Sequence, residues 1–409
     1  MISRSRPIAA MLICVALLYS SMLRAQEAAP IEDTAPIGTR QNYFLPKYRE
    51  GSFRHMDRIF PFHVVKRGGP IAELPRAERS LDITYQWNGG VHRLDELHAL
   101  TKTTGFIVIK DGKIVQERYF GGANEDSKFT SMSVAKSFTS TLVGLAIADG
   151  KINSIDQPIT DYLPQLNGSG YGGVPIKSIL QMSSGVKFSE SYLPGRYSDM
   201  DIAFQRAMID EDEPLNDFMK GLIRARPPGS RFVYKGADTQ VLGWLVKRVT
   251  GETLADYLSE KIWQPMGMER DAFWNVDSPG PNAMEAAFTC LNATLRDYAR
   301  FGLLFLNNGK FNGKQIVPAD WVEQATAPRS PQVEAGHLFK NYPLGYGYQW
   351  WTFPTDHAFV AQGIYFQFIY VNPKENLVIV KTSAFDHAWD AALEAQIYAA
   401  FDAIATALH

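Results

Sequence analysis

Cysteines and glycine-rich motifs are scarce in this 409-residue chain. It has two cysteines, Cys14 and Cys290, and Cys14 lies in a segment expected to be removed, so no intrachain disulfide would then be possible. The eight histidines are scattered without H-E-x-x-H or Cys/His spacing, and no G-x-S-x-G, Walker or dinucleotide-binding glycine pattern occurs. These absences argue against a zinc enzyme, an elbow-type Ser-His-Asp hydrolase and a nucleotide-dependent enzyme. We expect no metal and no cofactor, and we expect Cys290 to be a small buried hydrophobe.

Neither sign of charge is in excess. The chain has 41 basic and 43 acidic side chains, a net charge of −2, and 45% hydrophobic residues, which is ordinary globular composition. So balanced a charge provides no electrostatic reason to bind nucleic acid or an anionic membrane. We therefore expect a small-molecule substrate and no nucleic-acid partner; the oligomeric state stays open.

The N-terminus has the layout of a secretory signal peptide. Arg4 and Arg6 precede an uncharged apolar run over residues 8–23, and the small residue Ala25 offers a cleavage site before Gln26. The alternative is an uncleaved anchor, but the run is short for a membrane span and a polar stretch follows at once. The expected location is periplasmic or secreted, with no stable membrane span after cleavage.

The order of elements predicts an α+β fold. Helical spacing near 93–104 precedes a hairpin over 106–115 with an Asp111-Gly112 turn. Helical patterns then dominate until about residue 306, and the chain ends in an amphipathic helix near 389–408. Late strands are expected at 346–353, 359–363, 366–371 and 377–382. This order predicts an antiparallel sheet built from both ends of the chain, flanked by N- and C-terminal helices, with an inserted all-helical subdomain. The expected parts are a signal peptide (1–25), a linker and extension (26–92) and a main domain (93–409).

Ser133-Val134-Ala135-Lys136 opens an apolar-periodic helix that stops at Gly150. A serine hydroxyl needs a base, and a lysine three residues later lies on the same helix face. Burial can remove the charge of that lysine, and the helix N-terminus supplies free N–H groups. The alternative is a helix-start serine beside a solvated lysine. A second copy of the motif, Ser184 to Lys187, contains a glycine and precedes no helical stripe, so we interpret it as a turn.

Two later segments could complete such a site. Tyr234 precedes a helix that begins near residues 238–240, and it could relay a proton or be a half-buried core tyrosine. Gly363 ends an apolar strand, where glycine marks either a bend or the close approach of a ligand. The N–H of Ile364 could then contribute to an oxyanion hole.

Taken together and in this order, these residues resemble the serine β-lactamase and penicillin-binding superfamily, in its class C and esterase-like branch, and in particular the 6-aminohexanoate-dimer hydrolases. The stretches that carry the resemblance are 108–112, 131–137, 180–186, 238–243 and 291–302. The resemblance implies a β-lactamase-like serine hydrolase domain over 93–409. It implies these roles: nucleophile Ser133, base Lys136, catalytic tyrosine Tyr234, oxyanion-hole N–H groups of Ser133 and Ile364, and a substrate-contacting Tyr192. Gly363 and Tyr365 are further expected substrate contacts.

Three departures bear on the substrate. Ala361-Gln362-Gly363 replaces the K-T-G motif, so a β-lactam carboxylate would lack its usual cation. Gly236 stands where the family often has Asn or Ser, and Phe366 would add bulk near the oxyanion hole. We expect an exported serine hydrolase that cleaves ester or linear amide bonds through an acyl-enzyme on Ser133. The alternatives are a β-lactamase, a D-amino-acid peptidase acting on cell-wall-type substrates, and a non-catalytic penicillin-recognising module.

Export can be tested on the mature protein. If the N-terminal segment is a cleaved signal peptide, N-terminal sequencing of the exported protein should begin at Gln26, and thiol titration should find one cysteine, Cys290. An intact N-terminus in the membrane fraction would show instead that residues 8–23 form an anchor.

Overall fold

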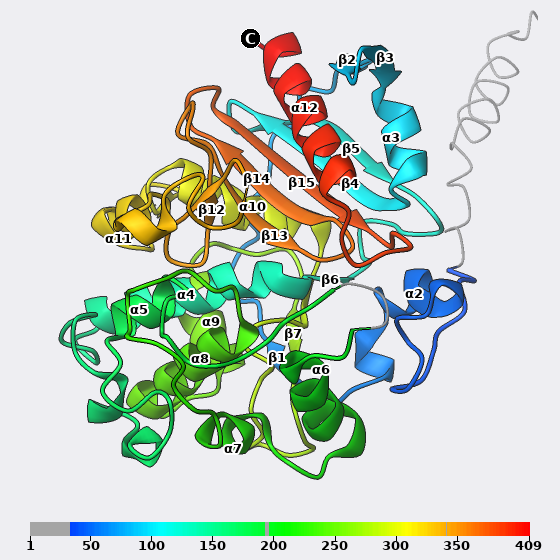
Figure 1. The fold of residues 1–409 in the computed structure, drawn as a ribbon. Helices are drawn as coiled ribbons and strands as arrows, with labels where there is room; N and C mark the ends of the chain where they lie inside the picture. Colours follow the sequence, from blue (N-terminus) through cyan, green and yellow to red (C-terminus); the bar gives the residue numbers. More distant parts are fainter. Residues whose placement is uncertain (1–32, 193–195, 341) are drawn as a thin grey trace, which may run out of the picture. The chain divides into compact units, whose positions relative to one another are not determined.

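A seven-stranded antiparallel sheet forms the upper half of the view in Figure 1. The computed structural model describes residues 33–192, 196–340 and 342–409, so the predicted signal peptide lies outside the described residues. The sheet has the order β11-β12-β13-β14-β15-β4-β5. Its strands are β4 (Thr103–Lys110), β5 (Lys113–Tyr119), β11 (Gly345–Tyr346), β12 (Trp351–Thr352), β13 (Phe359–Gly363), β14 (Gln367–Asn372) and β15 (Leu377–Ser383). Because β15 pairs with β4, the two ends of the chain meet in the middle of the sheet, as predicted.

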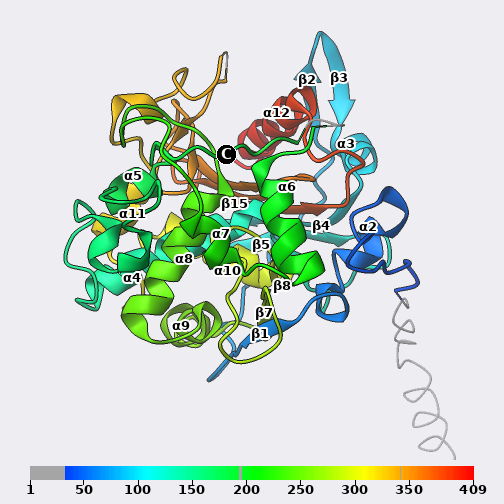
Figure 2. The ribbon, with the colours of Figure 1, turned by 60° about the horizontal axis from the view of Figure 1, so that its bottom comes forward.

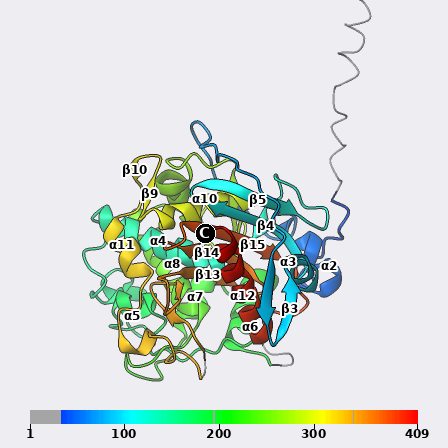
Figure 3. The ribbon, with the colours of Figure 1, turned by 90° about the horizontal axis from the view of Figure 1, so that it is seen from above.

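Helices cover both faces of this sheet. On one face, α3 (Leu94–Leu100) and α12 (Ala391–Ala407) pack their apolar side chains against alternate residues of β4, β14 and β15. On the other face, α10 (Leu295–Leu306) packs against the opposite set of residues. Figure 3 shows α12 beside the small hairpin of β2 (Thr84–Trp87) and β3 (Gly90–Arg93). The predicted fold class is confirmed.

The hairpin predicted over 106–115 is confirmed, whereas the single strand predicted over 346–353 is not. Asp111 and Gly112 join β4 to β5 with φ values of 51° and 72°, the left-handed pair that a two-residue hairpin turn requires. The single strand expected over 346–353 is instead two short strands, β11 and β12. The chain reverses between them because Gln349 adopts φ 65° and its buried amide donates to the Leu180 carbonyl, an interaction that no local pattern reveals.

The segment between β5 and β11 is mainly helical, as predicted, and its part from α4 to α9 lies in the lower half of the view in Figure 1. Its longer helices are α4 (Ala135–Ala148) and α8 (Gly236–Thr250), which pack against each other; α4 is buried along almost its whole length. Around them lie α5 (Ile176–Leu180), α6 (Asp199–Phe204), α7 (Leu215–Lys220), α9 (Leu254–Leu258) and, beyond α10, α11 (Ala319–Ala325), as Figure 2 shows from another side.

A second, four-stranded sheet was missed in the sequence. Its order is β1-β7-β8-β6, with β1 (Phe62–Val65), β6 (Phe129–Thr130), β7 (Ala272–Asn275) and β8 (Leu291–Ala293). These strands are short, and β6, β7 and β8 are buried on both faces, so they lack the alternation that identifies a strand. Through β1 the N-terminal extension joins the inserted region, and β6 leads directly into the turn that carries Ser133. The extension also holds α2 (Pro46–Ser52).

None of the helices in the described ranges combines the length and apolar character that crossing a bilayer demands.

Candidate active site

Ser133 lies in the turn between β6 and α4, and Lys136 lies in the first turn of α4. Ser133 is in a 3-10 turn, Met132–Val134, and α4 begins at Ala135. The Nζ atom of Lys136 is 2.8 Å from the Oγ atom of Ser133 and 3.2 Å from the carbonyl oxygen of Phe288. Ser133 is half-buried, whereas Lys136 is 1% exposed. The local helix geometry therefore joins the two side chains as the S-x-x-K spacing predicts.

Burial dominates the electrostatics of Lys136. Loss of hydration lowers the pKa of its ammonium to about 8 from an ordinary value of 10.5, while the charge of Glu190 acts in the opposite direction. The rings of Tyr234 and Phe288 lie 4.9 and 5.6 Å from Nζ and also favour the cation. A lysine with this pKa has a substantial neutral fraction near neutral pH and can accept a proton.

Tyr234 lies on the extended segment that precedes α8. Its ring stacks on Trp351 with centroids 5.5 Å apart, and its hydroxyl faces the Ser133 side chain. Burial raises the pKa of this phenol above its usual range, while the Ser133 hydroxyl acts in the opposite direction. Tyr234 is therefore a neutral hydroxyl in contact with Ser133, suited to pass a proton rather than to ionise.

The second S-x-x-K motif packs next to the segment that carries Tyr234. Ser184 is in a turn after α5, and its hydroxyl donates to the Asp238 carboxylate at 2.7 Å. Asp238 also pairs with Lys235 at 3.4 Å, with both side chains fully buried. Lys187 is exposed. The motif thus contributes Ser184 to a buried network beside Tyr234 and leaves its lysine in solvent.

Glu190 is a site residue that sequence reasoning missed. Its carboxylate accepts hydrogen bonds from the hydroxyl of Tyr192 and from the backbone N–H of Gly236. A Cβ at position 236 would lie 2.3 Å from the terminal methyl of Met200, so that side chain would have to move to admit one. The Glu190 carboxylate therefore lies next to position 236, where the family often has an Asn or Ser side chain. In the sequence it looks like any loop acid.

Tyr192 also lies beside Ser133. Burial raises the pKa of its phenol well above the usual range, and a hydrogen bond to Ser133 acts in the opposite direction. Tyr192 and Tyr234 thus both place neutral hydroxyls on Ser133.

Gly363 brings the end of β13 against the nucleophile's turn. A Cβ at this position would lie 2.7 Å from the Ser131 carbonyl oxygen and 3.0 Å from the Ser133 backbone nitrogen. No side chain fits in that space, so the close approach requires glycine. Ile364 follows directly and lines the same cavity as Ser133. It therefore lies near the turn that carries Ser133, and N–H groups at the start of a helix have no partners within the helix.

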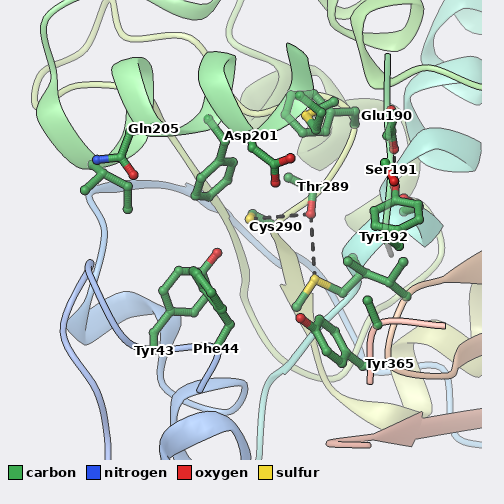
Figure 4. A pocket seen from close by; sticks show the side chains of 18 of the residues that line it. Tyr43, Phe44, Glu190, Ser191, Tyr192, Asp201, Gln205, Thr289, Cys290 and Tyr365 are labelled. Atoms are coloured by element: carbon green, nitrogen blue, oxygen red, sulfur yellow. Dashed lines mark hydrogen bonds between the residues drawn. The ribbon is translucent and has the colours of Figure 1, made fainter. Parts of the chain in front are cut away.

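Ser133, Tyr192, Ile364 and Tyr365 share one cavity of about 410 Å³. Figure 4 shows Tyr43 and Phe44 across this cavity from Glu190 and Tyr192. The remaining lining comes from Arg40 and Gln41 beside Tyr43 and Phe44; from Ser191, Arg196, Tyr197, Met200, Asp201, Phe204, Gln205 and Ile209 in and around α6; from Phe288, Thr289 and Cys290; and from Met132 and Ala388. The wall from the N-terminal extension was missed in the sequence, because residues 40–44 carry no motif.

Two further expectations concern residues next to this cavity. Cys290 is buried, as expected, and burial raises the pKa of its thiol to about 12, which leaves it unreactive. The expectation that Phe366 adds bulk at the oxyanion hole is wrong. Its ring is turned to the α12 side of the sheet, where it packs on Phe385 with centroids 4.9 Å apart.

Comparison with known proteins agrees with this geometry. The model of the Beta-lactamase family matches residues 98–402. The chain belongs to the beta-lactamase family. A 6-aminohexanoate-dimer hydrolase of Paenarthrobacter ureafaciens is 29% identical over 340 residues, which cover 81% of this chain and 84% of that protein.

Solved structures extend the likeness to the whole fold. A Bacillus anthracis protein provisionally assigned as a 6-aminohexanoate-dimer hydrolase has 29% identity and a TM-score of 0.82, covering 93% of this chain and 99% of its own. A family VIII carboxylesterase shares the fold at 17% identity, with a TM-score of 0.57 over 76% of this chain and 96% of its own. The predicted resemblance is confirmed, and family and fold make the chain a β-lactamase-type hydrolase.

The pKa of Lys136 generates a prediction for the pH dependence of hydrolysis. If the neutral amine is the base, kcat/KM for an uncharged ester should rise as pH increases through about 8 and fall below it, because protonation removes the base. Lys136→Arg keeps a cation that cannot shed its proton, so it should lose about 10²-fold or more of the activity at every pH.

The matched control is Lys187→Arg in the second S-x-x-K motif, which should keep the wild-type rate and pH midpoint. Substantial activity in Lys136→Arg would mean that Lys136 supplies charge rather than a base.

Proposed function

We propose that this protein is an exported serine hydrolase that cleaves ester and linear amide bonds through an acyl-enzyme on Ser133. The observation that carries the proposal is the buried Lys136 amine, 2.8 Å from the Ser133 hydroxyl and with its pKa lowered to about 8. A non-catalytic recognition module would have no need of a base that is costly to bury.

Acylation begins when neutral Lys136 takes the proton of Ser133 as Oγ attacks the substrate carbonyl carbon. The carbonyl oxygen becomes an oxyanion and accepts hydrogen bonds from the backbone N–H groups of Ser133 and Ile364. When the tetrahedral intermediate collapses, the bond to the leaving group breaks. The proton held by Lys136 passes to the leaving oxygen or nitrogen, with the Tyr234 hydroxyl as relay.

Deacylation repeats these steps with water. Lys136 accepts a proton, relayed by the Tyr234 hydroxyl, from the water that attacks the carbonyl carbon of the acyl-enzyme ester, and the same two N–H groups bind the oxyanion. The Ser133 oxygen leaves and takes the proton back, which releases the carboxylic acid and restores the free enzyme. Tyr192 contacts Ser133 and the cavity together, so it contributes to holding the substrate.

The charges of the cavity favour some substrates over others. Two acids, Glu190 and Asp201, and two arginines, Arg40 and Arg196, line it, and Arg40 is paired with Glu211. Ala361, at the position of the missing K-T-G lysine, is buried and apolar. A β-lactam carboxylate would lack the cation that a K-T-G lysine supplies. The 6-aminohexanoate dimer named in the relatives is a linear amide with an amino end and a carboxylate end, and a cavity lined by both acids and arginines suits these two charges.

The proposal is tested by labelling and by a substrate panel. A fluorophosphonate should modify Ser133, and Ser133→Ala should abolish both labelling and turnover. Short esters should be hydrolysed fastest, linear ω-amino amides more slowly because an amide leaves less readily, and penicillins only marginally. Mass mapping of the labelled peptide and kcat/KM for each substrate class provide the measurements.

Ser184→Ala is the control from the second motif. It should lower the melting temperature, because it removes a buried hydrogen bond to Asp238, yet leave Ser133 as the labelled residue. Labelling at another serine would overturn the mechanism. Efficient penicillin turnover would overturn the substrate ranking and favour a β-lactamase.

A further inference from the structure

The loop that follows Ile364 is conformationally unusual. Tyr365 and Phe366 have φ values of 61° and 64°, in the left-handed region that bulky residues avoid. Two such residues in succession are costly, and they persist only where the surrounding structure holds them in place. On the other side of the proposed oxyanion hole, Met132 directly precedes the nucleophile with φ 45°.

A buried arginine from the N-terminal extension holds this loop. Arg49 on α2 is 4% exposed, and the centre of its guanidinium lies 4.3 Å from the Tyr365 ring centroid. The guanidinium also donates to the backbone carbonyls of Phe385 and Phe44. A planar group that stacks and donates in several directions is a property of arginine that lysine does not share.

The backbone of the loop is tied to the segment after β15. The N–H of Tyr365 donates to the Ala388 carbonyl at 2.8 Å. The side-chain amide of Gln367 donates to the carbonyls of Tyr365 at 3.0 Å and Ser383 at 2.7 Å. These bonds and the Arg49 contact together fix the loop on both sides of its strained residues.

We infer that Arg49 is a positioning residue: by holding Tyr365 it keeps the strained loop in the conformation that aims the Ile364 N–H at the substrate carbonyl oxygen. The inference rests on the proposed function of this site. It assigns a part in catalysis to the N-terminal extension, because Arg49 lies before residues 98–402, the span of the family match.

The test compares Arg49→Lys with Arg54→Lys. Arg54 is a matched control, since it is 3% exposed, lies in the same extension and bonds Asp33 and the Gly121 carbonyl. Loss of one oxyanion-hole donor costs about 10²- to 10³-fold in kcat, so a misaimed donor should cost about 10- to 100-fold. Arg49→Lys should therefore lower kcat for an uncharged ester by that factor, with KM changed less than about twofold. Arg54→Lys should lower the melting temperature while kcat stays near the wild-type value.

The pH profile separates positioning from damage to the base. In Arg49→Lys the pH midpoint should stay at about 8, because Lys136 keeps its surroundings. Tyr365→Leu, at a half-buried position, removes the ring that Arg49 contacts and should lower kcat similarly. In the Tyr365→Leu background, Arg49→Lys should then have little further effect, because both act through one contact.

Independent, multiplying effects of the two substitutions would overturn the inference. So would a fall in kcat in Arg49→Lys no larger than in Arg54→Lys at the same loss of melting temperature. Should Arg49→Lys fail to fold, Tyr365→Leu decides alone: an unchanged kcat contradicts the inference. Failure of the proposed function is distinguishable, because the wild-type protein itself would then not form an acyl-enzyme on Ser133.

Discussion

The contact between the Lys136 amine and the Ser133 hydroxyl depends on keeping water away from the lysine. Helix α4 accomplishes this by being buried along almost its whole length among α8, α9, the loop between β11 and β12, and the segment around Phe288. The aromatic wall of Tyr234 and Trp351 closes another side. A solvated lysine at the same position would remain charged near neutral pH, and the serine would lack a base.

The proposed oxyanion hole depends on a second constraint, the close approach of two backbones. Gly363 places β13 within van der Waals distance of the Ser131–Ser133 turn, and any Cβ there would collide with it. Residues with left-handed backbone conformation lie in both of the segments that approach each other here: Met132 in one, and Tyr365 and Phe366 in the other. Such outliers gather where the chain must point particular groups at a ligand, and the packing around them bears the cost.

These constraints separate what could be predicted from what could not. The Ser133–Lys136 pair and the β4–β5 hairpin depend on residues three or four apart, and local geometry determines both. The overall fold was predictable because apolar patterns at the two ends of the chain needed one shared sheet. Glu190 and Arg49 could not be found in this way, since their partners, Gly236 and Tyr365, are far away in sequence and ordinary in composition. The side on which Phe366 packs depends on a backbone conformation that its sequence neighbours do not reveal.

The most direct test of this account is a titration of the Lys136 amine itself. In protein labelled with ¹⁵N or ¹³C at lysine, the Lys136 side-chain signal can be assigned by its loss in Lys136→Arg and followed by NMR against pH in the free enzyme. Burial beside Ser133 predicts a midpoint near 8. A midpoint near 10.5, the ordinary value for lysine, would show that the amine stays charged under working conditions and would contradict its role as base.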